Sequence, residues 1–160
     1  MADITTFPTE STLTASDRPI LGGERGPIET YTAAAAIKGG QVVVYISGTS
    51  GSVTPATGAT SEKVAGVALY NVASGGLCAV AQAGCIVKVV NADDTTAINP
   101  GAWIQTNDNA VLGTVNAIAF TGTESTLATQ FNVVGIATET IAGGGSGYAL
   151  LMPVPVTNKS

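Results

Sequence analysis

The sequence predicts an all-β protein, and three observations lead to that class. A strand–turn–strand segment at Val64–Val80 recurs 69 positions later at Val133–Leu151. The chain has 20 glycines, which suit turns and bulges, and it is rich in valine and threonine, which favour strands. No amphipathic stretch is long enough for a helix of useful length. We therefore expect a small β-barrel or β-tulip-like domain with an internally duplicated strand–turn–strand unit, preceded by an extended N-terminal arm.

The duplicated unit is built from small apolar residues. Gly66–Ala68 matches Gly135–Ala137, and Gly75–Gly76 matches Gly144–Gly145 before the second copy adds two residues ahead of its next apolar run. Almost none of these side chains can do chemistry, whereas a repeated β unit is a way to build a shell or a barrel. The duplication therefore predicts a structural part rather than a catalyst.

Residues 1–36 differ in composition from the rest of the chain. They contain three of the seven prolines, both arginines and five of the eleven acids. Because proline holds the preceding residue in extended geometry, this segment predicts an irregular arm with room for one short strand. The sequence thus divides into an extended N-terminal arm (1–36), a β-domain (37–156, with halves at about 39–90 and 99–155) and a frayed tail (157–160).

The first half of the β-domain is expected to contain four short strands. Gln41–Ile46 is a continuous apolar run, which fits a strand buried on both faces. Lys63–Tyr70 is interrupted by Gly66, which predicts a bulge or a close backbone approach. The other strands of this half are expected at Leu77–Gln82 and Cys85–Val90.

The second half repeats this pattern of short strands. Ala102–Thr106 and Ala110–Val115 form a predicted hairpin through Asn107–Asn109, because Asn and Asp tolerate the backbone angles of tight turns. Phe131–Glu139 and Gly147–Val154 form the last strands, joined through a glycine-rich turn. About nine to eleven short strands at this spacing are typical of β-sandwiches and barrels.

The charges and hydropathy of the chain exclude several partners. The net charge is −5 and the six lysines and arginines do not cluster, whereas nucleic-acid binding needs clustered cations. No run of about 18 apolar residues is present, so we expect no membrane span. The first residues lack the basic start and apolar core of a secretion signal, which indicates synthesis in a cytoplasm. Charged residues make up 11% of the chain against about 25% on average, which predicts that part of the surface is buried against a partner.

The sequence gives little support to catalysis or metal binding. The chain has no histidine, so Ser–His–acid and Cys–His arrangements are absent. The paired carboxylates Asp93–Asp94, with Asn91, fit either a calcium site or a solvated turn, and their spacing lacks the alternating ligands of a calcium loop. The run Gly143–Gly147 is followed by a strand rather than by the helix that a phosphate loop needs. We expect no enzyme, no catalytic residue, no cofactor and no metal site.

The two cysteines, Cys78 and Cys85, leave two interpretations open. Either they close a hairpin as a disulfide, or they are free thiols in the core. The lack of histidine and of further cysteines leaves no four-ligand zinc site, and free cysteine behaves as a small buried hydrophobe. The sequence favours the free thiols.

Three glycine-and-valine motifs resemble a known family. The motifs Gly40–Val44, Val64–Gly75 and Ala81–Val87 are similar to those of the capsid decoration, or cement, proteins of tailed viruses, and the similarity extends over about residues 30–155. The resemblance implies a β-barrel or β-tulip-like subunit on the outside of an expanded icosahedral shell, where it clamps neighbouring major capsid subunits. It implies a virion protein without an active site, made in the host cytoplasm, whose partners are the major capsid protein and itself. The expected assembly is a homotrimer, formed in solution or only on the capsid.

The arm and two aromatic residues are the candidate contact sites. An extended arm laid across a neighbouring capsid subunit would add a strand to the edge of its sheet. Trp103 and Tyr148 are expected at the interface between subunits, because Trp and Tyr anchor many interfaces. The arm residues expected to contact the capsid are Phe7, Pro8, Arg18, Pro19, Ile20, Arg25 and Ile28.

An alternative function stays open at this stage. A carbohydrate- or receptor-binding module of a virion fibre or spike would use exposed aromatic rings as stacking platforms. Tyr70, Trp103 and Tyr148 are the candidates for that role.

Overall fold

The computed structural model describes residues 20–22, 27–58, 63–93, 95–107, 111–118 and 132–155. The regular secondary structure in these residues is β-strand throughout, which confirms the predicted all-β class. The strands, in chain order, are β1 (Ile20–Gly22), β2 (Ile28–Ala33), β3 (Val42–Tyr45), β4 (Ser52–Pro55), β5 (Val64–Ala68), β6 (Leu77–Ala81), β7 (Ile86–Val90), β8 (Trp103–Thr106), β9 (Val115–Ala117), β10 (Asn132–Ala137) and β11 (Ser146–Pro155).

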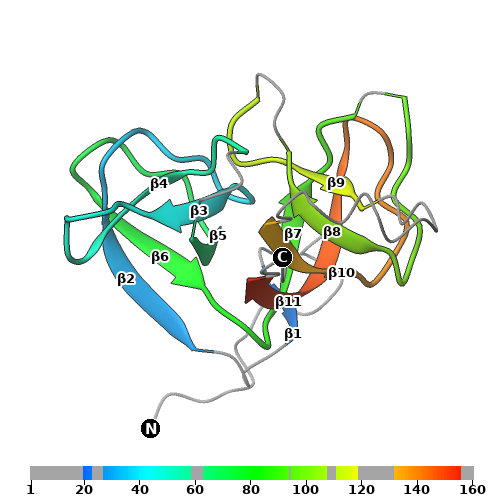
Figure 1. The fold of residues 1–160 in the computed structure, drawn as a ribbon, viewed down its shortest axis with the longest axis horizontal. Helices are drawn as coiled ribbons and strands as arrows, with labels where there is room; N and C mark the ends of the chain where they lie inside the picture. The colour runs from blue at the N-terminus through cyan, green and yellow to red at the C-terminus, as the bar shows by residue number, and fades with distance from the viewer. Residues whose placement is uncertain are drawn as a thin grey trace, which may run out of the picture.

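Five strands of the first half close into a barrel in the order β2-β4-β3-β5-β6, which Figure 1 shows as the left-hand lobe. Neighbouring strands pair antiparallel except at the closure between β2 and β4. There, Thr32 pairs in parallel with Ser52, and Ala33 with Val53. The small β-barrel that the sequence predicts is therefore present in the first half, which we call the first barrel.

The segment that the sequence analysis assigned to the arm, residues 1–36, contributes a strand to the first barrel. β2 falls inside the predicted arm, yet it pairs with β6 from Ile28 to Thr32. Tyr31 and Ala33 pack with the buried side chains of the first barrel, so the segment has the alternation of a strand. The prolines that precede it dominated the composition of the segment and concealed this short pattern. Residues 1–19 and 23–26 of the predicted arm lie outside the described residues.

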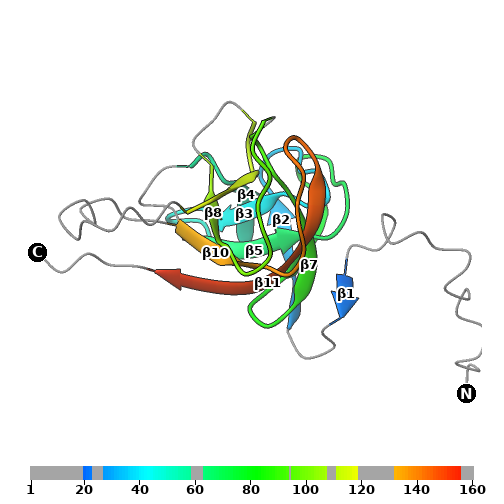
Figure 2. The same ribbon diagram turned by 90° about the vertical axis from the view of Figure 1, so that its right-hand side faces the viewer.

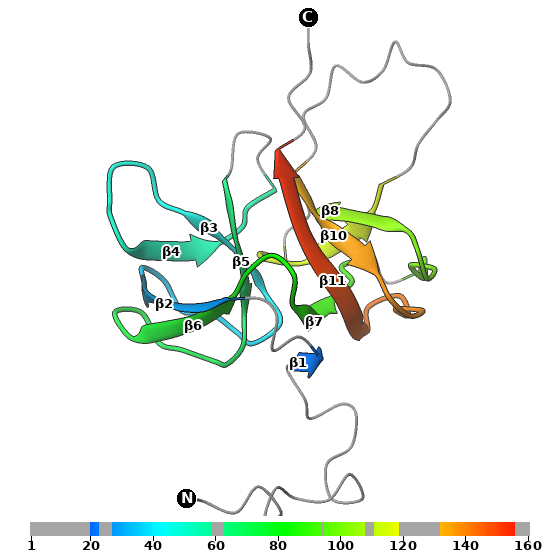
Figure 3. The same cartoon turned by 90° about the horizontal axis from the view of Figure 1, so that it is seen from below.

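The second half repeats the strand order of the first barrel. Its sheet has the order β1-β7-β11-β10-β8-β9. After β1, the strands β7, β11, β10, β8 and β9 correspond in turn to β2, β6, β5, β3 and β4 of the first barrel. A parallel bridge between Asn91 and Val115 brings the two ends of this series together. Ala92 donates a backbone hydrogen bond to Val115 (3.0 Å), just as Ala34 donates to Val53 (2.9 Å) at the closure of the first barrel. The second half is thus a second barrel of the same topology, closed by a single bridge, and Figure 3 shows the two as separate groups of strands.

The hydrogen bonds at the turns are also duplicated. Ile37 and Val72 exchange two backbone hydrogen bonds of 2.9 Å, and so do Ile98 and Ile141. Between β5 and β6 and between β10 and β11, equivalent residues keep the spacing of 69, because Ala68 pairs with Val80 as Ala137 pairs with Ala149. The prediction of two extra residues in the second copy is therefore wrong. The residues taken for an insertion, Ser146 and Gly147, occupy the strand positions of Leu77 and Cys78.

The predicted hairpin in the second half is partly correct. β8 and β9 pair antiparallel, with Thr106 opposite Val115. The return strand begins at Val115, however, and not at Ala110 as predicted, because Val111–Thr114 still turns and the Thr114 hydroxyl donates to the carbonyl of Val111 at 2.7 Å. The connection is longer than the tight turn expected at Asn107–Asn109, of which residues 108 and 109 lie outside the described residues.

Each barrel contains one glycine where two backbones come unusually close. A Cβ atom on Gly66 would lie 2.0 Å from the carbonyl oxygen of Ala81, and one on Gly135 would lie 2.0 Å from that of Leu150. The strand register shifts beside both glycines, in the β3–β5 pair and in the β10–β11 pair. The bulge or close approach predicted at Gly66 is therefore confirmed, and it recurs at the matching position of the second copy.

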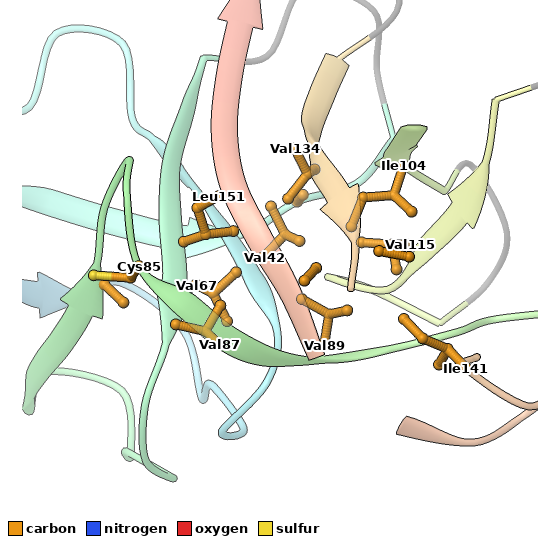
Figure 4. Packing of buried hydrophobic residues seen from close by; sticks show 14 of the residues in the cluster. Val42, Val67, Cys85, Val87, Val89, Ile104, Val115, Val134, Ile141 and Leu151 are labelled. Carbon is orange, nitrogen blue, oxygen red and sulfur yellow. The ribbon is translucent and has the colours of Figure 1, made fainter. Parts of the chain in front are cut away.

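Two groups of buried side chains form the core. Val42 and Val44 of β3 and Val67 of β5 point away from the first barrel and join the core of the second barrel, as Figure 4 shows for Val42 and Val67. Val43 points into the first barrel, so β3 is buried on both faces, as the sequence predicts. The core therefore runs without a break from the outer face of the first barrel into the interior of the second. The side chains buried inside the first barrel are Ala33, Ile37, Val43, Val53, Ala65, Ala68, Cys78 and Val80.

We expect Gly66→Ala and Gly135→Ala each to lower the free energy of unfolding by about 3 kcal/mol or more. The added methyl group would overlap a carbonyl oxygen that a paired strand holds in place. Urea unfolding of the purified variants measures this loss.

Gly75→Ala is the matched control, because nothing lies within 4 Å of its added Cβ. Its positive φ should cost only about 1–2 kcal/mol of backbone strain. If Gly66→Ala or Gly135→Ala unfolded at the same urea concentration as Gly75→Ala, the close backbone approach would be disproved.

Candidate interaction surfaces

The structure describes two of the seven arm residues proposed to contact the capsid. Ile20 begins β1, whose backbone pairs antiparallel with β7 at Val87, and Figure 2 shows the two strands side by side. Ile28 begins β2 and is exposed on the first barrel, opposite Ala81 of β6. The other five, Phe7, Pro8, Arg18, Pro19 and Arg25, lie outside the described residues.

The two residues expected at the subunit interface differ in burial. Tyr148 is only 4% exposed, because β11 lies between β7 and β10 and the turn after β10 folds back against it. The Glu139 carboxylate in that turn accepts a hydrogen bond of 3.0 Å from the Tyr148 backbone N–H. Tyr148 is thus enclosed by its own chain and is not available as a surface anchor. Trp103, at the start of β8, is half-buried.

Trp103 belongs to a row of apolar side chains across the second barrel. It pairs with Ile136 of β10, which pairs in turn with Leu150 of β11. Directly paired residues point to the same face of a sheet, so the three side chains lie side by side. All three are half-buried. We call them the Trp103 row.

The corresponding row of the first barrel is completely covered. Val42, Val67 and Ala81 occupy the equivalent positions on β3, β5 and β6, and each has 0% exposure. The second barrel covers them, since all three belong to the core that the barrels share. In the described part of the chain no barrel covers the Trp103 row, which makes it a candidate contact surface.

Four polar side chains meet at one end of the first barrel. The Tyr31 hydroxyl donates to a carboxylate oxygen of Glu29 at 2.6 Å and accepts from the amide of Gln82 at 2.8 Å. It also lies 3.1 Å from the Tyr45 hydroxyl, and the two rings meet edge to face at 5.6 Å. Burial and the hydrogen bonds to Glu29 and Tyr45 raise the pKa of the Tyr31 phenol. We call Glu29, Tyr31, Tyr45 and Gln82 the tyrosine cluster.

The aromatic residues of the alternative interpretation are not brought together. Tyr70 is 63% exposed and follows β5 of the first barrel, whereas Trp103 belongs to the second barrel and Tyr148 is buried. The pairing of Tyr31 with Tyr45 was missed, because they lie 14 residues apart on strands that are not neighbours. Only the alternation of inward-facing and outward-facing residues along each strand could have suggested that these two tyrosines meet.

The acidic loop forms a turn with its own backbone. The Asp93 carboxylate accepts hydrogen bonds from the backbone N–H of Thr95 (2.8 Å) and Thr96 (3.0 Å) and from the Thr95 hydroxyl (2.8 Å). These bonds lower the pKa of Asp93 to about 2. Asp94 lies outside the described residues, and in the described part of the chain no three His, Cys, Asp or Glu side chains gather where a metal ion would sit.

The glycine-rich run and the cysteines take structural roles. Gly144 and Gly145 form the turn that leads into β11, and Gly145 accepts a hydrogen bond from the backbone of Asn91 (2.9 Å). Cys78 and Cys85 are both buried free thiols, which confirms the favoured interpretation, and burial raises the pKa of the Cys78 thiol. Among the described residues, no helix has the length and apolar character to cross a membrane.

Two solved structures from phages share this fold. One is the N base of the head fibre gp8.5 of bacteriophage phi29, with a TM-score of 0.53, 18% identity, and coverage of 83% of this chain and 99% of that one. Another belongs to the capsid of the Myoviridae phage XM1, with a TM-score of 0.55, 15% identity, and coverage of 96% of this chain and 100% of that one. No protein-family model matches the chain, and no curated protein matches it either. At these identities the likeness shows a common fold, and it agrees with the resemblance to phage capsid decoration proteins.

We expect the Tyr31 phenol to ionise above pH 10.0, the ordinary pKa of tyrosine, as long as the protein is folded. Because the folded state holds this proton more tightly than the unfolded chain, the stabilisation is complete below about pH 10 and is lost as the pH rises toward the folded-state pKa. The measurement is the tyrosinate absorbance of the wild type minus that of Tyr31→Phe during an alkaline titration. A difference curve with its midpoint at or below the ordinary value would contradict the hydrogen-bonded phenol.

Proposed function

We propose that this chain is a structural virion protein that binds the outer surface of an expanded phage capsid and stabilises the head. The observation that carries the proposal is the likeness to a head-fibre base and to a capsid protein along nearly their whole lengths. The low charge of the chain and its small apolar repeats fit a structural part. The protein acts by clamping neighbouring major capsid subunits and does no catalysis. Stabilisation follows from mass action, because a ligand that binds only the expanded shell resists its disassembly.

The arm makes the main capsid contact in this proposal. β1 pairs with β7 and so fixes the point at which residues 1–19 join the described part of the chain. A segment of this length spans at most about 60 Å when fully extended, which is enough to cross a neighbouring subunit. Backbone hydrogen bonds to the edge of a capsid sheet would give affinity without clustered charge.

Contacts between copies are proposed at the Trp103 row. The equivalent row of the first barrel is covered by a barrel, which supports the view that such a row needs an apolar partner. We assign that partner to neighbouring copies in a homotrimer, formed in solution or on the capsid. Symmetric association would remove the half-buried Trp103, Ile136 and Leu150 from water.

Deletion of residues 1–19 is expected to abolish binding to expanded, undecorated capsids. The deletion ends before β1, so both barrels should keep the unfolding midpoint of the full chain. Gradient sedimentation counts the bound copies per capsid, and capsid melting measures the stabilisation. Saturation by the full chain at a simple symmetric ratio supports the proposal. Full affinity of the truncated protein would refute the role of the arm, and a handful of copies per particle would indicate a fibre component instead.

Trp103→Glu is expected to weaken self-association at least about tenfold, because it places a charge in a desolvated apolar contact. Sedimentation velocity measures the trimer fraction in solution, and the number of bound copies measures assembly on the capsid. Leu77→Glu is the matched control, since Leu77 is 75% exposed on the first barrel. Equal effects of the two substitutions would show that Trp103 has no special role.

A further inference from the structure

The tyrosine cluster is a departure from the plan of the duplicated barrel. Glu29, Tyr31 and Tyr45 lie at inward positions of β2 and β3, and Gln82 follows β6 directly. The strand pairings place four buried residues at the equivalent positions of the second barrel, none of them charged or aromatic. They are Val87, Val89, Thr106 and Leu151. The same fold therefore closes this end with three aliphatic side chains and a threonine, so the fold itself does not require the tyrosine cluster.

The hydrogen bonds within the cluster leave a defined set of acceptors. Because the single Tyr31 proton goes to Glu29, the Tyr31 oxygen accepts from both Gln82 and the Tyr45 hydroxyl. The second carboxylate oxygen of Glu29 and the amide oxygen of Gln82 receive no hydrogen bond from the residues that the structure describes. Within the described residues, both oxygens therefore keep lone pairs to which a ligand can donate.

An exposed aromatic ring packs against Tyr31, the residue that binds both Glu29 and Gln82. Tyr45 is 42% exposed, and its hydroxyl and ring are both held by Tyr31. Exposure to water explains why this end of the barrel is polar, but it does not explain why a large apolar ring is kept at the surface. A ring that is already fixed loses little conformational entropy when a ligand stacks on it.

We propose that Tyr45, Glu29 and Gln82 form a binding site for a neutral glycan at this end of the first barrel. The apolar face of a pyranose ring stacks on Tyr45, and its hydroxyl groups donate to the free oxygens of Glu29 and Gln82. The Glu29 carboxylate and the net charge of −5 disfavour sialylated or sulfated sugars and phosphates. The site does not depend on capsid attachment, since its residues belong to a barrel that is closed on its own.

The test begins with a glycan array probed with the purified full-length protein. We expect binding to neutral oligosaccharides, which calorimetric titration with the best of them then quantifies. Tyr45→Ala should weaken that binding at least tenfold and Glu29→Gln several-fold. Tyr45→Phe should keep most of it, because the stacking face remains. Near-ultraviolet circular dichroism checks that each variant is folded.

Tyr70→Ala is the matched control, because Tyr70 is an exposed tyrosine of the same barrel outside the cluster. It should bind the glycan as the wild type does. The proposal is overturned if no neutral glycan binds, if folded Tyr45→Ala binds like the wild type, or if Tyr70→Ala loses as much as Tyr45→Ala. Recognition of anionic glycans alone, or of a lysine-rich peptide in place of a sugar, would also overturn it.

Discussion

The outer face of β3 and β5 packs into the second barrel, and the rest of the structure depends on that contact. A single parallel bridge, Asn91 to Val115, joins the ends of the second barrel, so its interior needs side chains from elsewhere to exclude water. Val42, Val44 and Val67 supply them. Burial of one such side chain contributes about 1.5–3 kcal/mol, so a few of them match the whole stability of a typical domain. The two barrels are therefore held together by one shared core.

Duplication within one chain has given two similar barrels different surroundings. The row through Val67 is buried by the neighbouring barrel, whereas no second barrel lies against the equivalent row through Ile136 among the residues that the structure describes. Conversely, the end of the second barrel near Val89 is buried, whereas the equivalent end of the first barrel carries Tyr31 among polar partners. In two barrels joined in tandem, one copy of each of these surfaces is not covered by the other barrel. The two candidate contact surfaces are the free copies.

The sequence predicted those features that depend on local pattern. The run at Val42–Val44 indicated burial on both faces, and Gly66 indicated a close backbone approach, because each leaves a mark in consecutive residues. The duplication of the whole barrel is not visible in the sequence. Backbone pairing fixes the positions of β2 and β7 without constraining their side chains, so Tyr31 and Val89 occupy equivalent positions although their side chains differ. Burial of Tyr148 and the meeting of Tyr31 with Tyr45 depend on strands that are distant in sequence.

Two barrels that share one core suggest how the protein, under the proposed function, would sense the state of a shell. Under the proposed function, the arm holds one capsid subunit and the barrels contact others, and the shared core around Val67 prevents the barrels from turning against each other. A rigid ligand of this kind fits only one spacing of its partners. It stabilises the expanded lattice relative to the unexpanded one only by the difference between its binding free energies for these two lattices. Loosening the shared core would therefore reduce selectivity for the expanded shell even if every surface contact were retained.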